Sequence, residues 1–258
     1  MRTELIAVYG EPGVGKTMFS LCLAHKLQQI AKGYAICVSA DTLTPQLAAL
    51  LPDSDHGEMD CLGRLLLRSN YTPQMAMSYL LTHPQNANLG IMGFAPGVTP
   101  QTYRFTMADA GNLMDCLGKL ELGGDCKDYV IVDCQSDPLG DPLTDYAISH
   151  ANHRFRLVTA DLRGLMYERS ARSALRDEQY GWKDTWLVAS RLLPETPMEE
   201  CISAFGKFQL VLPYSKELEV TFAGGRLPIG AQKRPGVLYE AEVHRCAEIL
   251  VRSGGRDH

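Results

Sequence analysis

Short apolar runs alternate along the chain with longer amphipathic segments. Each run has about the length of one β-strand, and several contain no polar residue. Uninterrupted apolar runs are typical of strands that are covered on both faces, as in a parallel sheet. The runs predict strands at residues 5–9, 34–40, 88–94, 128–133, 156–160, 185–189 and 208–212.

Several segments between these runs carry apolar residues at helical spacing. Residues 18–32 place Phe19 and Leu23 on one face of a predicted helix, and residues 107–120 repeat the pattern. The stretch between residues 51 and 90 is richer in Asp, His, Asn and Met, with short helical patches. We expect that stretch to decorate the sheet rather than to extend it.

Strands that alternate with helices imply right-handed crossovers and an α/β fold with a doubly wound, mostly parallel sheet flanked by helices. We expect a single domain over residues 1–258, because a chain of 258 residues with 45% hydrophobic content can bury a sizeable core. Ligands of such sheets bind at the carboxyl ends of the strands, where Gly10, Asp41 and Asp133 fall.

A complete phosphate-binding loop follows the first predicted strand. Residues 10–17 read Gly-Glu-Pro-Gly-Val-Gly-Lys-Thr, which matches G-x-x-x-x-G-K-[ST], and a predicted helix comes next. In this motif backbone N–H groups cradle the phosphates, Lys16 reaches the β- and γ-phosphates, and the Thr17 hydroxyl binds magnesium. We therefore expect ATP or ADP with Mg²⁺ as ligands. The candidate nucleotide-binding residues here are Gly10, Glu11, Pro12, Gly13, Val14, Gly15, Lys16, Thr17 and Met18.

Two acidic residues close predicted strands near this loop. Asp133 is the expected partner of the magnesium ion held by Thr17, and an Asp that caps a turn is the alternative. Asp41 is a candidate to polarise the attacking water or to reach the metal, but it also precedes a short helix as a favoured N-cap. The candidate catalytic residues are Lys16 and Asp41, and the candidate metal ligands are Thr17, Asp133 and Asp41.

Taken in their order along the chain, these motifs resemble the ParA/MinD superfamily of positioning ATPases, including its pilus-locating CpaE/TadZ branch. The resemblance is carried by the loop, Ser39-Ala40-Asp41, Asp133 and the ending that starts at Pro213-Tyr214. It implies a SIMIBI-like P-loop NTPase fold, an Asp41 that assists hydrolysis and an Asp133 that supports magnesium. It also implies that Pro213 and Tyr214 lie against adenine.

The sequence departs from that family at two places. The family's loop begins Lys-Gly-Gly, and its lysine reaches the partner's phosphates across a nucleotide-sandwich dimer, whereas this chain has Glu11-Pro12-Gly13. A carboxylate there repels phosphate, which argues against catalysis by a lysine from the partner. The family often reads the adenine edge with an Asn where this chain has Ser190, a candidate nucleotide-binding residue. Base selectivity is therefore expected to be looser or differently arranged.

Composition and charge limit the classes of partner and the cellular compartment that we expect. A net charge of -5 and a pI of about 5.8 argue against a surface dominated by nucleic-acid contacts. Acidic residues are interleaved with the arginines between Arg154 and Arg176, which favours a solvated helix face over a nucleic-acid surface and leaves the second open. Scattered cysteines without a C-x-x-C pair indicate reduced thiols, and no apolar stretch approaches the ~18 residues of a spanning helix. We expect a cytoplasmic protein without a membrane span.

Together, the loop and the resemblance predict an ATP-binding protein that hydrolyses ATP slowly with magnesium. The resemblance implies a homodimer when ATP is bound and a protein partner in a pilus, secretion or partition machine. Two alternatives stay open. Glu11 in place of lysine also fits a nucleotide-binding scaffold without hydrolysis, and the loop alone also fits a P-loop small-molecule kinase.

Overall fold

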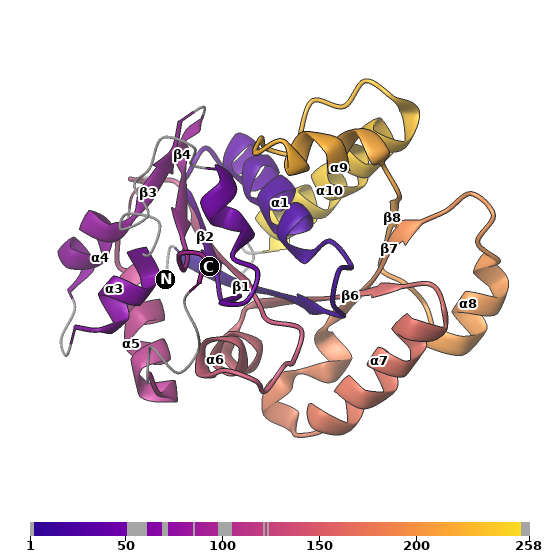
Figure 1. Ribbon diagram of the computed structural model, residues 1–258, viewed down its shortest axis with the longest axis horizontal. Helices are drawn as coiled ribbons and strands as arrows, with labels where there is room; N and C mark the ends of the chain where they lie inside the picture. The colour runs from indigo at the N-terminus through magenta and orange to yellow at the C-terminus, as the bar shows by residue number, and fades with distance from the viewer. Residues whose placement is uncertain are drawn as a thin grey trace.

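A single sheet organises the computed structural model, which describes residues 3–50, 61–68, 72–84, 86–97, 105–120, 122 and 124–253. The strands are β1 (Thr3–Gly10), β2 (Ala35–Ser39), β3 (Leu81–His83), β4 (Asn86–Met92), β5 (Asp128–Asp133), β6 (His153–Thr159), β7 (Trp186–Leu192) and β8 (Leu210–Pro213). They form an 8-stranded sheet in the order β3-β4-β2-β5-β1-β6-β7-β8 (Figure 1). Every pairing is parallel except that of β3 with β4, so the predicted fold class is confirmed.

Helices cover both faces of this sheet, which is why β2 and β5 are buried at every position. The helices are α1 (Lys16–Ala31), α3 (Cys61–Leu66), α4 (Pro73–Tyr79), α5 (Met107–Gly118), α6 (Pro142–His150), α7 (Leu162–Ala174), α8 (Met198–Phe205), α9 (Lys216–Ala223) and α10 (Arg234–Ser253). Short 3₁₀ turns lie at Gln46–Leu50, Glu178–Tyr180 and Trp182–Asp184. None of the described helices is long and apolar enough to cross a bilayer.

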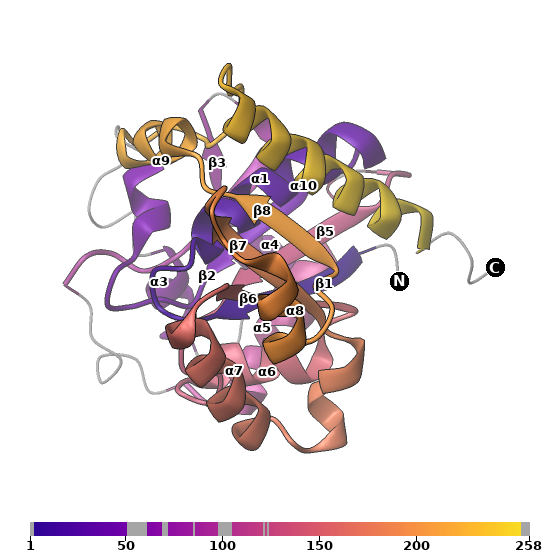
Figure 2. The same ribbon diagram turned by 90° about the vertical axis from the view of Figure 1, so that its right-hand side faces the viewer.

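Within the described residues, three apolar clusters hold these layers together. The first packs α1, α9 and α10 on one face of the sheet, through Phe19 of α1 and Tyr239 of α10. On the other face, α3, α5 and α6 form the second cluster, and α7 and α8 form the third beside β6 and β7 (Figures 1 and 2). The carboxyl ends of the parallel strands meet at one edge of this sandwich.

The expectation that residues 51–90 only decorate the sheet is wrong. β3 pairs antiparallel with β4 and adds an edge strand. An edge strand of three residues that contains Thr82 and His83 has no apolar run, so the sequence pattern did not reveal it. Parts of this stretch, at residues 51–60, 69–71 and 85, lie outside the described residues.

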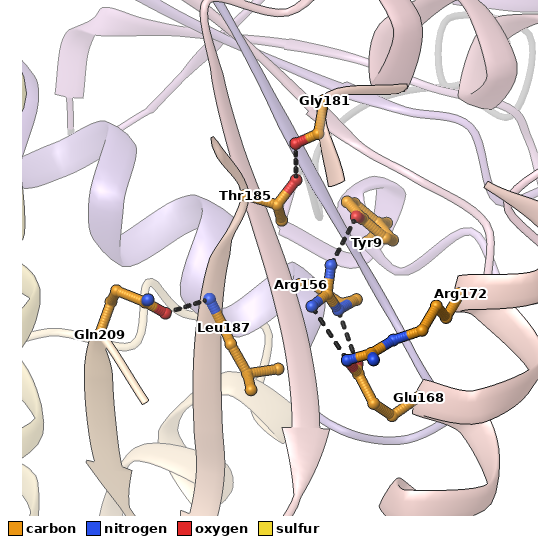
Figure 3. A network of polar contacts seen from close by, with 8 residues as sticks. All are labelled: Tyr9, Arg156, Glu168, Arg172, Gly181, Thr185, Leu187 and Gln209. Atoms are coloured by element: carbon orange, nitrogen blue, oxygen red, sulfur yellow. Dashed lines mark hydrogen bonds and ion pairs between the residues drawn. The ribbon is translucent and has the colours of Figure 1, made fainter. Parts of the chain in front are cut away.

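The arginines between residues 154 and 176 do not form one solvated helix face. Arg154 and Arg156 lie in β6, and Arg156 is only 3% exposed. Its burial is possible because Glu168 of α7 pairs with it (Figure 3). The predicted solvated face is therefore wrong for β6, whereas the arginines of α7 are exposed as expected.

Candidate nucleotide-binding site

The phosphate-binding loop joins β1 to α1 at the centre of the sheet. Two of its glycines are needed for steric reasons: a Cβ on Gly10 would lie 2.2 Å from the carbonyl oxygen of Leu157, and Gly15 has a left-handed φ of 95°. Gly15 is also the N-cap of α1, and no side chain in the described part of the chain caps that end. The first N–H groups of α1 are therefore available to an anion.

Lys16 points back into the loop. Its Nζ donates to the carbonyl oxygens of Gly10 and Glu11, at 3.3 Å each, and to Ser136 Oγ at 2.7 Å. Burial lowers the pKa of Lys16, and the charge of nearby Asp133 partly offsets that effect. Ser136 was not predicted from the sequence, although it follows Asp133 by three residues. Lys16 is thus held by neutral oxygens that a phosphate can replace.

Thr17 and Asp133 lie in direct contact. Thr17 Oγ1 donates to Asp133 Oδ2 at 2.6 Å, while the other carboxylate oxygen is buried without a hydrogen-bond partner among the described residues. Burial raises the pKa of Asp133 to about 6, against the lowering effects of the Thr17 hydrogen bond and of Lys16. The Thr17 hydroxyl and the Asp133 carboxylate oxygen that has no partner suit Mg²⁺, which prefers hard oxygen ligands. These two residues fit the predicted metal site.

The Asp41 carboxylate caps the turn that follows it, as in the N-cap alternative. Its Oδ1 accepts hydrogen bonds from the backbone N–H groups of Leu43 and Thr44, at 2.9 Å each, and its Oδ2 accepts one from Thr44 Oγ1 at 2.6 Å. Its charge still contributes to the raised pKa of Asp133. Gln135, which the sequence did not single out, donates from Nε2 to the carbonyl oxygen of Ala40 at 2.9 Å and ties the two strand ends together.

The Glu11 carboxylate is turned towards β6 and α7. It is fully buried, and its Oε1 accepts hydrogen bonds from the backbone N–H and the hydroxyl of Thr159, the latter at 2.6 Å. Arg163 Nε lies 2.9 Å from its Oε2. The arginine therefore counters the negative charge that was expected to repel phosphate, and Glu11 anchors the loop to the neighbouring strand.

Ser190 and Tyr214 occupy different places near the loop. Ser190 Oγ donates to the carbonyl oxygen of Val14 at 2.8 Å, so it fastens β7 to the loop. Pro213 ends β8, and Tyr214 after it lines a cleft of about 300 Å³ at the carboxyl ends of β6, β7 and β8. Arg191 lines the same cleft and was missed by sequence reasoning.

Solved structures of other proteins share this architecture. No family model and no curated protein sequence matches the chain. The ParA family ATPase of Chlorobium tepidum superposes with a TM-score of 0.76 at 12% identity, over 97% of this chain and 100% of that one. The MinC:MinD complex of Aquifex aeolicus gives 0.67 at 16% identity, over 96% of each chain. MinD of Pyrococcus horikoshii, complexed with Mg-ADP, gives 0.67 at 14% identity, over 96% and 97%.

The chain has the fold of the ParA/MinD ATPases. The fold resemblance drawn from the sequence is thereby confirmed, and the CpaE/TadZ branch stays a prediction. In this ParA/MinD fold the phosphate loop follows β1, Asp133 ends the adjacent strand β5, and Asp41 follows β2. The candidate residues converge because parallel strands end at a common edge.

Proposed function

We propose that the protein is a slow, magnesium-dependent ATPase whose single P-loop domain occupies residues 1–258. It works in the cytoplasm, dimerises when ATP is bound, and positions or regulates a protein partner such as a pilus, secretion or partition machine. The contact between Thr17 and Asp133, beside Lys16 and the uncapped start of α1, carries this proposal. The fold shared with ParA and MinD ATPases supports it.

The residues divide the work of phosphoryl transfer. The α1 N–H groups and Lys16 bind the phosphates, and Thr17 and Asp133 would hold Mg²⁺. The metal supplies positive charge that neutralises phosphate oxygens in the transition state. Asp41, fixed by its own turn, orients the attacking water.

Nucleotide binding also changes the contacts of the loop after β5. Lys16 must leave Ser136 to reach a phosphate, so that loop loses a hydrogen bond of 2.7 Å. Gln135 transmits the change to the end of β2 through Ala40. Rearrangement of these two loops gives the ATP-bound surface a different shape, which supports dimerisation controlled by nucleotide.

Calorimetry and phosphate release test the proposal. Wild-type protein is expected to bind ATP with Mg²⁺ and to release phosphate slowly, and chelation of the metal should stop release. Lys16→Ala is expected to weaken ATP binding by about 10–100-fold, because a charge-assisted hydrogen bond to phosphate is lost. Asp41→Ala should slow release without weakening binding. Unchanged binding and turnover in both variants would reject the assigned site.

A scaffold that binds nucleotide without hydrolysis is the second candidate. Glu11 favours this candidate, because it stands where the related loops have the lysine and is bonded to Thr159. Asp41 favours it as well, because its carboxylate is bonded to its own turn. ATP that stays intact after prolonged incubation, on protein that remains dimeric, would decide for the scaffold. Release of phosphate that depends on Asp41 would decide for the ATPase.

A further inference from the structure

The guanidinium of Arg163 is held at the edge of the phosphate-binding loop. Its Nε lies 2.9 Å from Glu11 Oε2. The Glu11 carboxylate is fully buried, and its other oxygen accepts hydrogen bonds from the backbone N–H and the hydroxyl of Thr159. A carboxylate that is fixed on the second residue of the loop therefore determines where the guanidinium of Arg163 lies.

The shortest contact of this ion pair uses one of the three guanidinium nitrogens. Within the described part of the chain, neither Nη group of Arg163 donates a hydrogen bond. The side chain is 60% exposed and lines the cleft of about 300 Å³ beside the loop. Because guanidinium donors lie in one plane, they can bind two phosphate oxygens at once. The Nη groups of Arg163 are therefore available to an anion at the loop.

The ion pair lies next to the groups that bind phosphate. Lys16 Nζ donates to the backbone carbonyl oxygen of Glu11 at 3.3 Å. Burial lowers the pKa of Lys16, and the charge of the Glu11 carboxylate is among the nearby charges that raise it. Glu11 is thus within electrostatic reach of Lys16, and Arg163 contacts Glu11. Two cations therefore flank the loop on which the phosphates of ATP are proposed to lie.

We infer that Arg163 is a catalytic residue, whose Nη groups bind the oxygens of the transferred phosphoryl group, and that Glu11 is its positioning residue. The inference rests on the proposed ATPase function and deepens it. In the hydrolysis step, water attacks the γ-phosphorus, the bond from this phosphorus to the bridging oxygen breaks, and ADP leaves with the electron pair. The protons of the water go to the phosphate and to solvent. A donor that is already in place stabilises the charge that develops on the phosphoryl oxygens.

Two substitutions separate a contact with phosphate from neutralisation of Glu11. If Arg163 only masks the charge of Glu11, it is dispensable once that charge is removed in Glu11→Gln. If it binds the transferred phosphoryl group, the double variant Glu11→Gln, Arg163→Ala is expected to release phosphate about 10²-fold more slowly than Glu11→Gln. Arg163→Lys in the same background should recover only part of that loss, because an ammonium lacks the planar donors.

Binding of ADP with aluminium fluoride and Mg²⁺, which together mimic the transferred phosphoryl group, gives a readout besides turnover. The double variant is expected to bind ADP alone as tightly as Glu11→Gln does. With aluminium fluoride present it should bind ADP about 10²-fold more weakly than Glu11→Gln, because the lost contact belongs to the transition state. Arg169→Ala is the matched control, since Arg169 is another exposed arginine of α7, and it should change neither affinity nor turnover.

The inference is overturned if the double variant releases phosphate as fast as Glu11→Gln. It is also overturned if the two proteins gain the same factor in ADP affinity from aluminium fluoride, because Arg163 would then make no contact that is special to the transferred group. Wild-type protein that releases no phosphate would instead overturn the proposed ATPase function, and this inference with it.

Discussion

Asp133→Asn is expected to lower magnesium-dependent phosphate release by about 10²–10³-fold. The asparagine can still accept the hydrogen bond of Thr17 at 2.6 Å, but it lacks the charge that a magnesium site requires. Loss of several kcal/mol of transition-state stabilisation corresponds to this factor. Release of phosphate by the purified variant measures the effect. Asp141→Asn is the control. Asp141 is also buried and lies in the segment after β5, but it caps the start of α6, which asparagine does equally well.

The same substitution is expected to stabilise the protein in the absence of nucleotide and metal. Burial raises the pKa of Asp133 from 3.8 to about 6, so at pH 7 the folded state holds a buried charge. The folded state binds the proton more tightly than the unfolded state. The resulting stabilisation is full below about pH 4 and is lost as the pH rises through about 6.

Wild-type protein should therefore lose up to about 3 kcal/mol of stability between these pH values relative to Asp133→Asn. Urea unfolding of both proteins between pH 4 and 8 measures the difference. Parallel pH profiles would contradict the raised pKa of Asp133. A variant that is less stable than wild type at pH 7 would show that the charged carboxylate gains more from Thr17 and Lys16 than it loses by burial.

The fold was largely predictable because burial on two faces leaves a clear sequence pattern. β5, at Asp128–Asp133, is buried at every position and was predicted with the same bounds. The edge strand β3 was missed because a strand with a solvent-facing side does not need apolar residues throughout. Patterns along the chain thus report how completely a strand is covered.

The site was predictable only where a motif fixes the spacing. The loop motif and the end of an apolar strand identify Thr17 and Asp133 as candidates, and the fold brings them into contact. Ser136 and Arg163 carry no such signal: each is a polar residue whose role comes from a contact made by the fold. The partner of Ser136, Lys16, lies 120 residues away in the sequence.

Glu11 illustrates the same limit of sequence reasoning. Its charge was evident, but its direction was not, because Thr159 and Arg163 are brought to it by the pairing of β1 with β6. The sequence suggested repulsion of phosphate, whereas the fold supplies a compensating arginine. A charge in a loop can be interpreted only when its partners across the sheet are known.

A buried ion pair supports β1 just before the phosphate-binding loop (Figure 3). Arg156 Nε and Nη2 lie 2.7 and 3.1 Å from the two carboxylate oxygens of Glu168, and Nη1 donates to the hydroxyl of Tyr9 at 3.3 Å. The guanidinium lies 3.5 Å from the centre of the Trp182 ring. Arg172 reaches the same carboxylate from the surface, at 3.5 Å.

Arg156→Ala is expected to lower the free energy of unfolding by about 3–5 kcal/mol, because it leaves the Glu168 carboxylate buried without its main partner. Arg172→Ala, at an exposed position, should cost less than about 1 kcal/mol. Urea unfolding at pH 7 measures both. Replacement of the pair by Arg156→Met and Glu168→Leu together should recover most of the loss, because no charge is then left buried.

Arg156 and Arg172 contact the same carboxylate, that of Glu168. A difference in stability between the two single variants therefore reports the effect of burial. Arg156 is 3% exposed, whereas the side chain of Arg172 is 64% exposed, and water replaces a lost partner only at the second position. Equal costs for the two single variants would contradict this account. A double variant as unstable as Arg156→Ala would show that the contacts with Trp182 and Tyr9, rather than the charge of Glu168, dominate the loss.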